Sequence, residues 1–233
     1  MSSEKIKEKH RKKNRDMFNS IAGKYDFLNR FLSFGTDVIW RKMAVKRLKI
    51  NEHNLILDLA TGTGDLAKEA LKKKPKAVFG IDPAHEMIKR TQSKLKLNYY
   101  AVEGFAEFLP FSSLSFDRAM IAYGIRNFSD RKAALNEIFR VLKKESLFGI
   151  LEFSESRSSF FRMIYKVYFN RILSKLGGWI SKNKEAYQYL PESVSSFVSP
   201  EALAKECENA GFKIVEIKPI FTGITSFVLL KKP

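Results

Sequence analysis

The stretch Asp58–Ala67, DLATGTGDLA, joins the end of an apolar run to two glycines and the start of an amphipathic segment. We expect a strand over 55–60 before the glycines and a helix over 66–73 after them. Gly62 and Gly64 allow the backbone to turn sharply and a ligand to approach closely. The helix N-terminus beyond them favours a carboxylate or a phosphate. The stretch therefore predicts a ligand-binding loop at the carboxyl end of a buried strand.

A second acidic position, Asp82, ends the next apolar run over 77–82, eighteen residues after Gly64. A carboxylate at this place can accept hydrogen bonds from both hydroxyls of a ribose. The loop and Asp82 together therefore predict an adenosine-type ligand. Asp82 followed by Pro83 is also typical of a helix N-cap with proline in the first helical position, which would need no ligand.

The segment GTGDLA also satisfies the G-x-G-x-x-A pattern of dinucleotide-binding enzymes, so a dehydrogenase is one alternative. Asp58 and Asp65, however, flank the glycines, where they would repel a pyrophosphate and suit a cationic sulfonium ligand with an α-amino group. Asp65 can instead complement the dipole of the following helix. Two apolar runs over 212–218 and 224–230 predict a closing antiparallel hairpin, in place of a second mononucleotide-binding half.

Other apolar runs, over 98–103, 116–123 and 147–153, lack the alternation of a half-exposed strand. Strands that are buried on both faces form such runs, so we expect an α/β fold with a mostly parallel sheet. Helical patterns occupy the rest of the chain, over 16–48, 83–95, 131–142, 157–176 and 200–210.

The composition of the 233 residues is that of a globular protein, with 45% hydrophobic and 29% charged side chains. We find no apolar run near the ~20 residues that a membrane-spanning helix needs. A lone cysteine, Cys207, excludes an internal disulfide, and three scattered histidines predict no metal site. Forty-two Lys and Arg against 25 Asp and Glu give a net charge of +17. This charge predicts an anionic partner, either nucleic acid, a membrane surface or an acidic substrate.

Two segments concentrate positive charge. The first fifteen residues carry seven basic and two acidic side chains, which fits either a solvated helix start or a contact with an anionic surface. The range 156–184 carries seven basic residues and no acidic one, and its helical part is apolar over most of its surface. A cationic amphipathic helix of this kind is typical of a lipid interface, although a lid helix packed on the core fits the same pattern.

The chain resembles the class I S-adenosylmethionine methyltransferases over nearly its whole length, and specifically the C-methyltransferases of ubiquinone and menaquinone biosynthesis. The glycine loop alone indicates only the superfamily. More specific segments are YDFLN (25–29), GIRN (124–127) and YLPES (189–193). The resemblance implies a Rossmann-like class I fold, with a seven-stranded, mostly parallel sheet of order 3-2-1-4-5-7-6 in which strand 7 is antiparallel.

The same resemblance implies a single methyltransferase domain over 1–233. We expect it to consist of an N-terminal helical cap (1–50), a cofactor-binding core (51–153), a helical lid insertion (154–199) and a C-terminal helix with a hairpin (200–233).

The cofactor that the resemblance implies is S-adenosylmethionine, the methyl donor. Its expected contacts are Gly62, Thr63, Gly64, Asp82, Phe105, Ala106 and Ala122. Two of these positions depart from the family, which usually has Asp or Asn before Ala106 to accept the adenine amino group, and often Ser at position 122. With Phe105 and Ala122 in their place, adenine recognition would rest on backbone groups and on stacking against Phe105.

The expected catalytic residues are Arg126, Asn127 and Tyr25. Methyl transfer to a ring carbon needs a quinol that has lost a hydroxyl proton. Arginine stays protonated, so we expect Arg126 to stabilise the phenolate or to orient a water that takes the proton. Asn127 would fix that geometry, and Tyr25 would close the pocket and donate to the same network. Arg126 can instead form a salt bridge with Asp130 or Glu152, and Tyr25 can simply pack in the core.

These observations predict S-adenosylmethionine-dependent C-methylation of a polyprenylated quinol, either demethylmenaquinol or the equivalent benzoquinol. We expect a cytoplasmic enzyme that is peripheral on an anionic membrane face, with no nucleic acid partner, and we leave a homodimer open. One alternative is a methyltransferase of another small molecule or of nucleic acid, although AYGIRN (122–127) lacks the [ND]PP[FY] motif of base N-methyltransferases. Another is a basic membrane- or RNA-binding module with a vestigial cofactor site.

Overall fold

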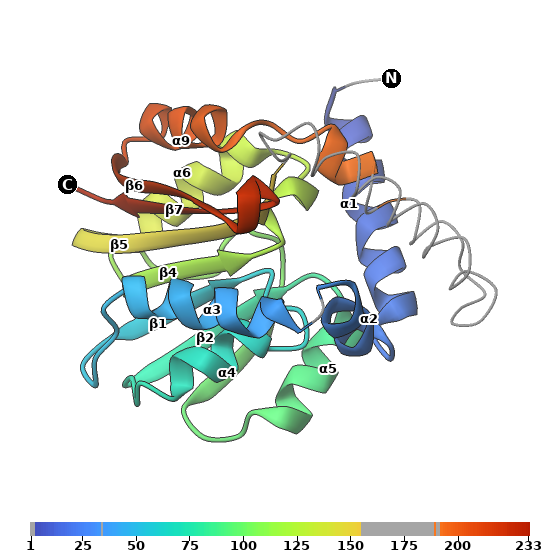
Figure 1. Cartoon of the computed structure of the whole chain (residues 1–233), viewed down its shortest axis with the longest axis horizontal. Helices are drawn as coiled ribbons and strands as arrows, with labels where there is room; N and C mark the ends of the chain where they lie inside the picture. The colour runs from blue at the N-terminus through green and yellow to red at the C-terminus, as the bar shows by residue number, and fades with distance from the viewer. Residues whose placement is uncertain (1–2, 34, 155–188, 190–191) are drawn as a thin grey trace.

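The computed structural model describes residues 3–33, 35–154, 189 and 192–233, and its centre is a seven-stranded sheet (Figure 1). The strand order is β3-β2-β1-β4-β5-β7-β6. Neighbours from β3 to β5 pair in parallel, and β7 is antiparallel to both β5 and β6. The expected order and the antiparallel strand 7 are thus confirmed. The strands are β1 (Leu55–Leu59), β2 (Ala77–Asp82), β3 (Tyr99–Glu103), β4 (Phe116–Ala122), β5 (Leu142–Phe153), β6 (Lys213–Ile220) and β7 (Thr225–Lys231).

Helices cover both faces of the sheet, so the side chains along the central strands are buried on both sides. Leu57 and Leu59 of β1 pack in a core with the apolar residues of α6 and α9. Ile56, which points to the opposite face, packs with those of α3 and α4. The helices are α1 (Ser3–Ile21), α2 (Tyr25–Leu32), α3 (Thr36–Arg47), α4 (Asp65–Leu71), α5 (His85–Lys94), α6 (Arg131–Val141) and α9 (Pro200–Asn209), with 3-10 turns η1 (Ile125–Asn127) and η2 (Phe221–Gly223).

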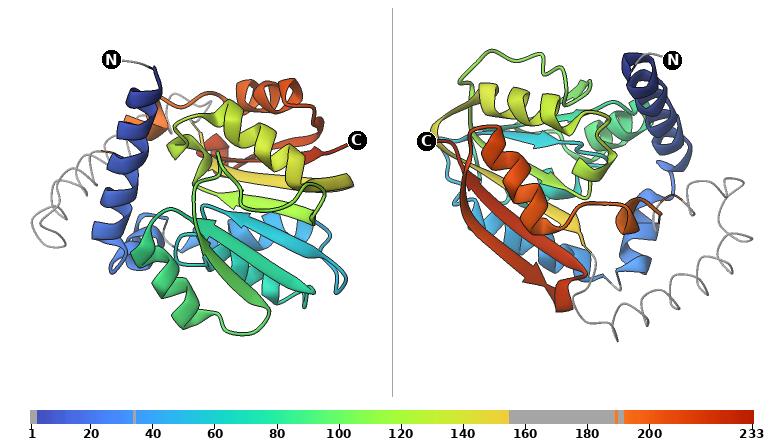
Figure 2. Two further views of the ribbon diagram at one scale, coloured as in Figure 1. Left: turned by 180° about the vertical axis from the view of Figure 1, so that it is seen from behind. Right: turned by 90° about the horizontal axis from the view of Figure 1, so that it is seen from above.

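The N-terminal segment forms three helices, and the first of them lies across the edge of the sheet where β1, β2 and β4 end (Figures 1 and 2). The basic first residues are helical from Ser3 onward. α1 is tied to three separate parts of the core. The bonds join Lys7 to Asp130 before α6 (2.6 Å), Asn14 to the carbonyl of Asn127 in η1 (3.0 Å), and Asn19 to the backbone N–H of Glu86 in α5 (2.9 Å).

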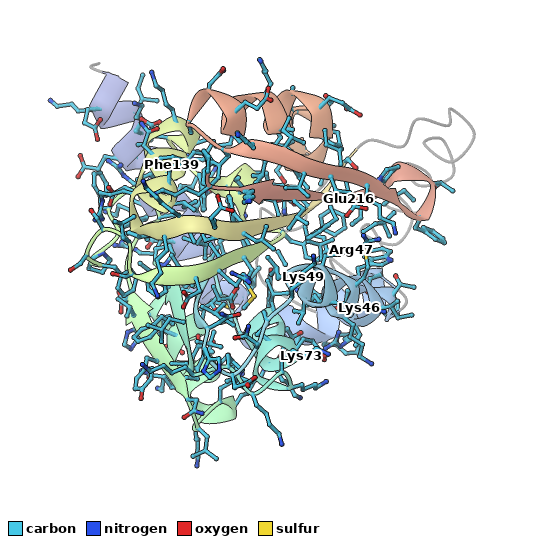
Figure 3. All side chains as sticks on the ribbon, turned by 90° about the vertical axis from the view of Figure 1, so that its left-hand side faces the viewer. Lys46, Arg47, Lys49, Lys73, Phe139 and Glu216 are labelled. Atoms are coloured by element: carbon cyan, nitrogen blue, oxygen red, sulfur yellow. The ribbon has the colours of Figure 1, made fainter. Side chains whose placement is uncertain are left out.

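The end of the molecule opposite α1 also carries positive charge. Lys46 and Lys49, at the end of α3, and Lys73, after α4, are exposed there (Figure 3). Arg47 of α3 pairs with Glu216 of β6 at 3.1 Å, so α3 is tied to the far edge of the sheet. Among the described residues, exposed positive charge is therefore not confined to α1.

The helix expected over 157–176 lies outside the described residues. Within the part of the chain that the structure describes, no helix has the length and apolar character needed to cross a membrane. Among the same residues, no three His, Cys, Asp or Glu side chains gather in a way that could hold a metal ion.

Candidate functional site

A cleft opens at the carboxyl ends of β1, β2 and β4, next to α1. Its empty space is about 700 Å³, a volume that includes open solvent at its mouth. The chain passes from β3 on one side of β1 to β4 on the other, so the strand order reverses beside β1, and ligands of open α/β sheets bind at such a switch point. Ala60, Asp82 and Ala122 line the cleft from the ends of these three strands.

The glycine loop reaches the cleft through Gly62. Its φ is +55° and that of Gly64 is +83°, in the left-handed region that favours glycine. A Cβ on Gly64 would lie 2.5 Å from the Thr91 side chain, so the loop packs too closely on α5 for any other residue. A Cβ on Gly62 would meet no atom closer than 3.8 Å, in this case from Tyr25. Gly62 therefore leaves room beside Tyr25 without a clash, whereas Gly64 is packed tightly against α5.

Asp82 joins the loop to the second strand. Its Oδ2 accepts the N–H of Gly62 and its Oδ1 that of Ala84, both at 2.9 Å. The carboxyl is buried, and burial raises its pKa to about 6. α5 begins at His85 with Ala84 as its N-cap, so the interpretation of Asp82 as an N-cap is wrong. A carboxylate can accept about four hydrogen bonds, so Asp82 keeps capacity for a ligand in the cleft.

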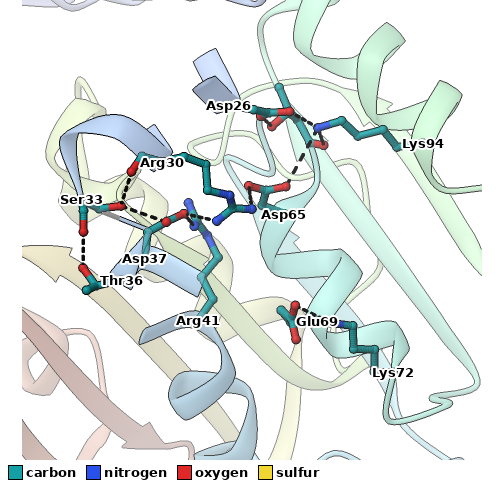
Figure 4. Close-up of polar contacts among 11 residues, drawn as sticks. Asp26, Arg30, Ser33, Thr36, Asp37, Arg41, Asp65, Glu69, Lys72 and Lys94 are labelled. Carbon is teal, nitrogen blue, oxygen red and sulfur yellow. Dashed lines mark hydrogen bonds and ion pairs between the residues drawn. The ribbon is translucent and has the colours of Figure 1, made fainter. Parts of the chain in front are cut away.

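The other polar side chains of the loop turn away from the cleft. Thr63 donates to Asp26 of α2, which also binds Lys94 of α5, and neither Thr63 nor Gly64 lines the cleft. Asp65 pairs with Arg30 at 3.1 Å (Figure 4). These contacts fasten α2 to the loop and to α5. Thr63 and Gly64 thus shape the loop and hold it to the N-terminal helices.

Asp58 lies beneath the loop. It is almost fully buried, accepts from the hydroxyl of Thr61 at 2.6 Å, and does not line the cleft. Burial raises its pKa to about 7. The expectation that Asp58 and Asp65 would face a cationic ligand is therefore not met, because internal partners take up both carboxylates.

The expected adenine positions do lie at the cleft. Phe105, Ala106 and Ala122 line it, together with Glu107. The Glu107 carboxylate is buried, and its Oε1 accepts from the N–H and hydroxyl of Ser129 and from the N–H of Asp130. Glu107 therefore holds the turn before α6 against one wall of the cleft.

Arg126 sits behind the cleft wall. Its Nη1 lies 2.7 Å from Oε1 of Glu152, and both side chains are nearly inaccessible, at 6% and 2%. The guanidinium also donates to the carbonyl of Tyr123 and to the hydroxyl of Ser193, and it does not line the cleft. Of the two salt bridges considered from the sequence, the one with Glu152 forms. Asp130 instead pairs with Lys7 and caps α6.

Asn127 lines the cleft and connects three distant parts of the chain. Its Oδ1 accepts from the hydroxyl of Tyr189 at 2.7 Å, and its carbonyl accepts from Asn14 of α1 at 3.0 Å. Neither partner was identified as a site residue from the sequence. Tyr189 belongs to the quoted segment YLPES, so a signal existed for it, whereas Asn14 lies in a polar stretch without any motif.

Tyr25 lines the same cleft, between the glycine loop and α1. Its ring meets that of Phe18 edge-on, with the centroids 6.1 Å apart. Desolvation raises the pKa of Tyr25, whereas a side-chain hydrogen bond with Asn29 and the charges of Arg126 and Arg41 act in the opposite direction. The phenol is therefore neutral at ordinary pH and can donate a hydrogen bond to a ligand.

Comparisons with known proteins agree with this arrangement. The model of the ubiE/COQ5 methyltransferase family matches residues 4–231. The ubiquinone/menaquinone biosynthesis C-methyltransferase UbiE of Campylobacter jejuni strain 81-176 is 41% identical over 227 residues, covering 93% of this chain and 96% of the relative. The demethylmenaquinone methyltransferase of Thermus thermophilus is 45% identical over 202 residues, covering 85% of this chain and 92% of the relative.

Solved structures share the fold at low sequence identity. A SAM-dependent methyltransferase of Thermotoga maritima superposes with a TM-score of 0.66 at 21% identity, covering 94% of this chain and 99% of the other. A SAM-dependent methyltransferase of Aquifex aeolicus superposes with a TM-score of 0.62 at 16% identity, covering 83% of this chain and 89% of the other. Because the family model spans almost the whole chain and the curated relatives exceed 40% identity, the chain belongs to the ubiE/COQ5 methyltransferase family.

Proposed function

We propose that this methyltransferase moves the methyl group of S-adenosylmethionine to a ring carbon of a polyprenylated quinol, either demethylmenaquinol or the equivalent benzoquinol. The relatives from C. jejuni and T. thermophilus are named for these reactions, which supports the proposal. The observation that supports the proposal is that one cleft is lined by residues expected to bind the cofactor and by residues expected to bind the acceptor. Gly62 and Asp82 lie on it as expected for the cofactor, together with Tyr25 and Asn127 as expected for the acceptor.

The residues present fit the cofactor. Asp82 has a carboxylate on the cleft with capacity beyond its two backbone bonds, and it would accept the ribose hydroxyls. Gly62 leaves space beside the loop, and the Phe105 ring supplies an apolar face for a base. The cofactor supplies a methyl group on a sulfonium, an electrophile that a quinol carbon can attack once its hydroxyl proton has left.

The quinol would be oriented by Tyr25 and Asn127. Both line the cleft, the first as a neutral phenol and the second with its amide held by Tyr189. Together they would fix the quinol oxygen and exclude water from the reacting carbon, which is how a positioned site lowers a bimolecular barrier.

Arg126 would act on the phenolate through its charge and without direct contact, because it does not line the cleft and is held by Glu152. Its charge already acts on Tyr25 of the cleft. In a poorly hydrated site a fixed cation of this kind stabilises developing negative charge more than it would in water. We assign the quinol proton to a water oriented by this network.

We further propose a cytoplasmic enzyme bound to the membrane face, since a polyprenyl tail keeps its quinol in the bilayer. Lys5, Lys9, Lys12 and Lys13 of α1 are exposed, while Lys7 and Arg11 make contacts within the protein. Each exposed lysine near an anionic lipid surface contributes about 1 kcal/mol, screened by salt. The cationic segment over 156–184 would add an apolar contribution.

A methyl-transfer assay with three acceptors tests the function. Demethylmenaquinol, the equivalent benzoquinol and a mixed RNA are each offered with S-adenosylmethionine under reducing conditions, which keep the ring as a quinol. We expect methylation of at least one quinol and none of the RNA. Methylation of RNA alone, or the absence of saturable cofactor binding, would contradict the proposal.

A further inference from the structure

The two carboxylate oxygens of Glu107 have different surroundings. Its Oε1 takes three donors from the turn before α6, the N–H of Ser129 (3.0 Å), the hydroxyl of Ser129 (2.7 Å) and the N–H of Asp130 (3.3 Å). No described residue donates to Oε2. The residue is only 5% exposed, and it lines the cleft. Because Oε1 is turned toward the 129–130 turn, Oε2 is the oxygen that a ligand in the cleft can reach.

A donor that arrives from the cleft would form a charge-assisted hydrogen bond with Oε2. Glu107 follows Phe105 and Ala106, the two positions expected to meet the adenine ring. Phe105 has no side-chain atom that can accept a hydrogen bond from the 6-amino group of adenine.

We propose that Oε2 of Glu107 accepts the hydrogen bond from the 6-amino group of the cofactor's adenine, in place of the acceptor that Phe105 lacks. This inference rests on the proposed function, since it requires an adenosine cofactor in the cleft. It makes Glu107 a specificity residue. A carboxylate only accepts, so it binds a 6-amino group and is repelled by the 6-oxygen of an inosine analogue.

Glu107→Gln tests the proposal, because it separates the two oxygens. The amide oxygen stays with the 129–130 turn, where three donors require an acceptor. The amide NH₂ then replaces Oε2 and presents donors to the base. Titration calorimetry would measure the binding of S-adenosylhomocysteine and S-inosylhomocysteine to the parent and to the variant, without any turnover.

We expect Glu107→Gln to weaken the binding of S-adenosylhomocysteine about ten-fold or more, as loss of a hydrogen bond to a charged group does. The same change should tighten the binding of S-inosylhomocysteine, so the preference for the adenosine ligand over the inosine ligand falls. Equal factors for both ligands, or no change in either, would show that Glu107 only supports the turn and would overturn the proposal. If the parent does not bind S-adenosylhomocysteine at all, the proposed function fails instead.

Two further variants guard the result. Glu86→Gln removes a carboxylate from an exposed position on α5 that does not line the cleft, and it should leave the ratio of the two affinities unchanged. Phe105→Asn in the Glu107→Gln background adds an amide beside the base, and it should restore part of the preference for S-adenosylhomocysteine. Rescue of this kind cannot arise from a role in folding alone.

Discussion

The buried pair of Arg126 and Glu152 should dominate the stability of variants at this site. Their charged atoms lie 2.7 Å apart, with side-chain exposures of 6% and 2%. Replacing one partner by Met leaves the other charge buried and unpaired, which costs about 3–5 kcal/mol of unfolding free energy. For a chain of this size each kcal/mol lowers Tm by about 2–4 °C, so either single variant should melt about 6–20 °C below the parent.

The double variant Arg126→Met, Glu152→Met separates folding from chemistry. Removing both charges removes the unpaired ion, so part of the lost stability should return. The N–H of Phe153 loses its bond to Glu152, and the carbonyl of Tyr123 loses that to Arg126. These leave a residual cost of about 1–3 kcal/mol for each group that stays unsatisfied. The double variant should therefore be more stable than either single variant.

Urea unfolding followed by tryptophan fluorescence measures these stabilities, and methyl transfer at saturating cofactor measures turnover. If Arg126 stabilises the phenolate, the double variant should fold, bind cofactor and turn over about 100- to 10,000-fold more slowly than the parent. Single variants as stable as the parent would refute the argument from burial. A double variant with turnover within a few-fold of the parent would leave Arg126 a purely structural role.

The remaining predictions concern the cofactor, the acceptor, the buried carboxyls and the membrane. Cofactor affinity should level off above about pH 7 and fall roughly ten-fold between pH 7 and pH 5, because Asp82 with a pKa of about 6 loses its charge. Calorimetry with Asp82→Asn should show weak binding at every pH. Tyr25→Phe should leave cofactor affinity within a few-fold and lower turnover about ten-fold or more, the size expected for one lost donor; unchanged turnover would mean that Tyr25 only packs. Asp58, whose folded pKa of about 7 exceeds its usual value, should destabilise the fold above that pH and not below pH 4. Urea unfolding should therefore show that Asp58→Asn raises the free energy of unfolding, by an amount that shrinks as the pH falls. Sedimentation with anionic vesicles should weaken when Lys5, Lys9, Lys12 and Lys13 become Gln. Replacing Phe160, Phe161 and Tyr165 by Ser should remove the part of the vesicle binding that resists salt. Equal binding to neutral vesicles would contradict the electrostatic account.

The strands could be predicted because their apolar runs are continuous. The run over 77–82 matches β2 residue for residue, and the strand order followed from the family resemblance. β5 begins at Leu142, earlier than the expected 147, because the polar residues over 143–146 continue the strand through a shift of register against β4. Hydropathy alone cannot show such an irregular segment.

The site could be predicted most directly where a residue lies at or just beyond the end of its own strand. Gly62 and Asp82 lie on the cleft because their positions follow directly from β1 and β2. The partner of Arg126 depended on which of two acids the fold brings near. Asn14 and Tyr189 meet Asn127 across 113 and 62 residues of chain, a convergence that no local pattern records.

The most direct test of the proposed reaction is where the methyl group goes. The enzyme is incubated with demethylmenaquinol or its benzoquinol equivalent and S-adenosylmethionine carrying a ¹³C methyl group, and the product is analysed by carbon NMR. We predict a signal in the range of a methyl group on an aromatic carbon, with the ring oxygens unmethylated. A methoxy signal, or label found only on another acceptor, would contradict the assignment of this cleft to C-methylation of a quinol.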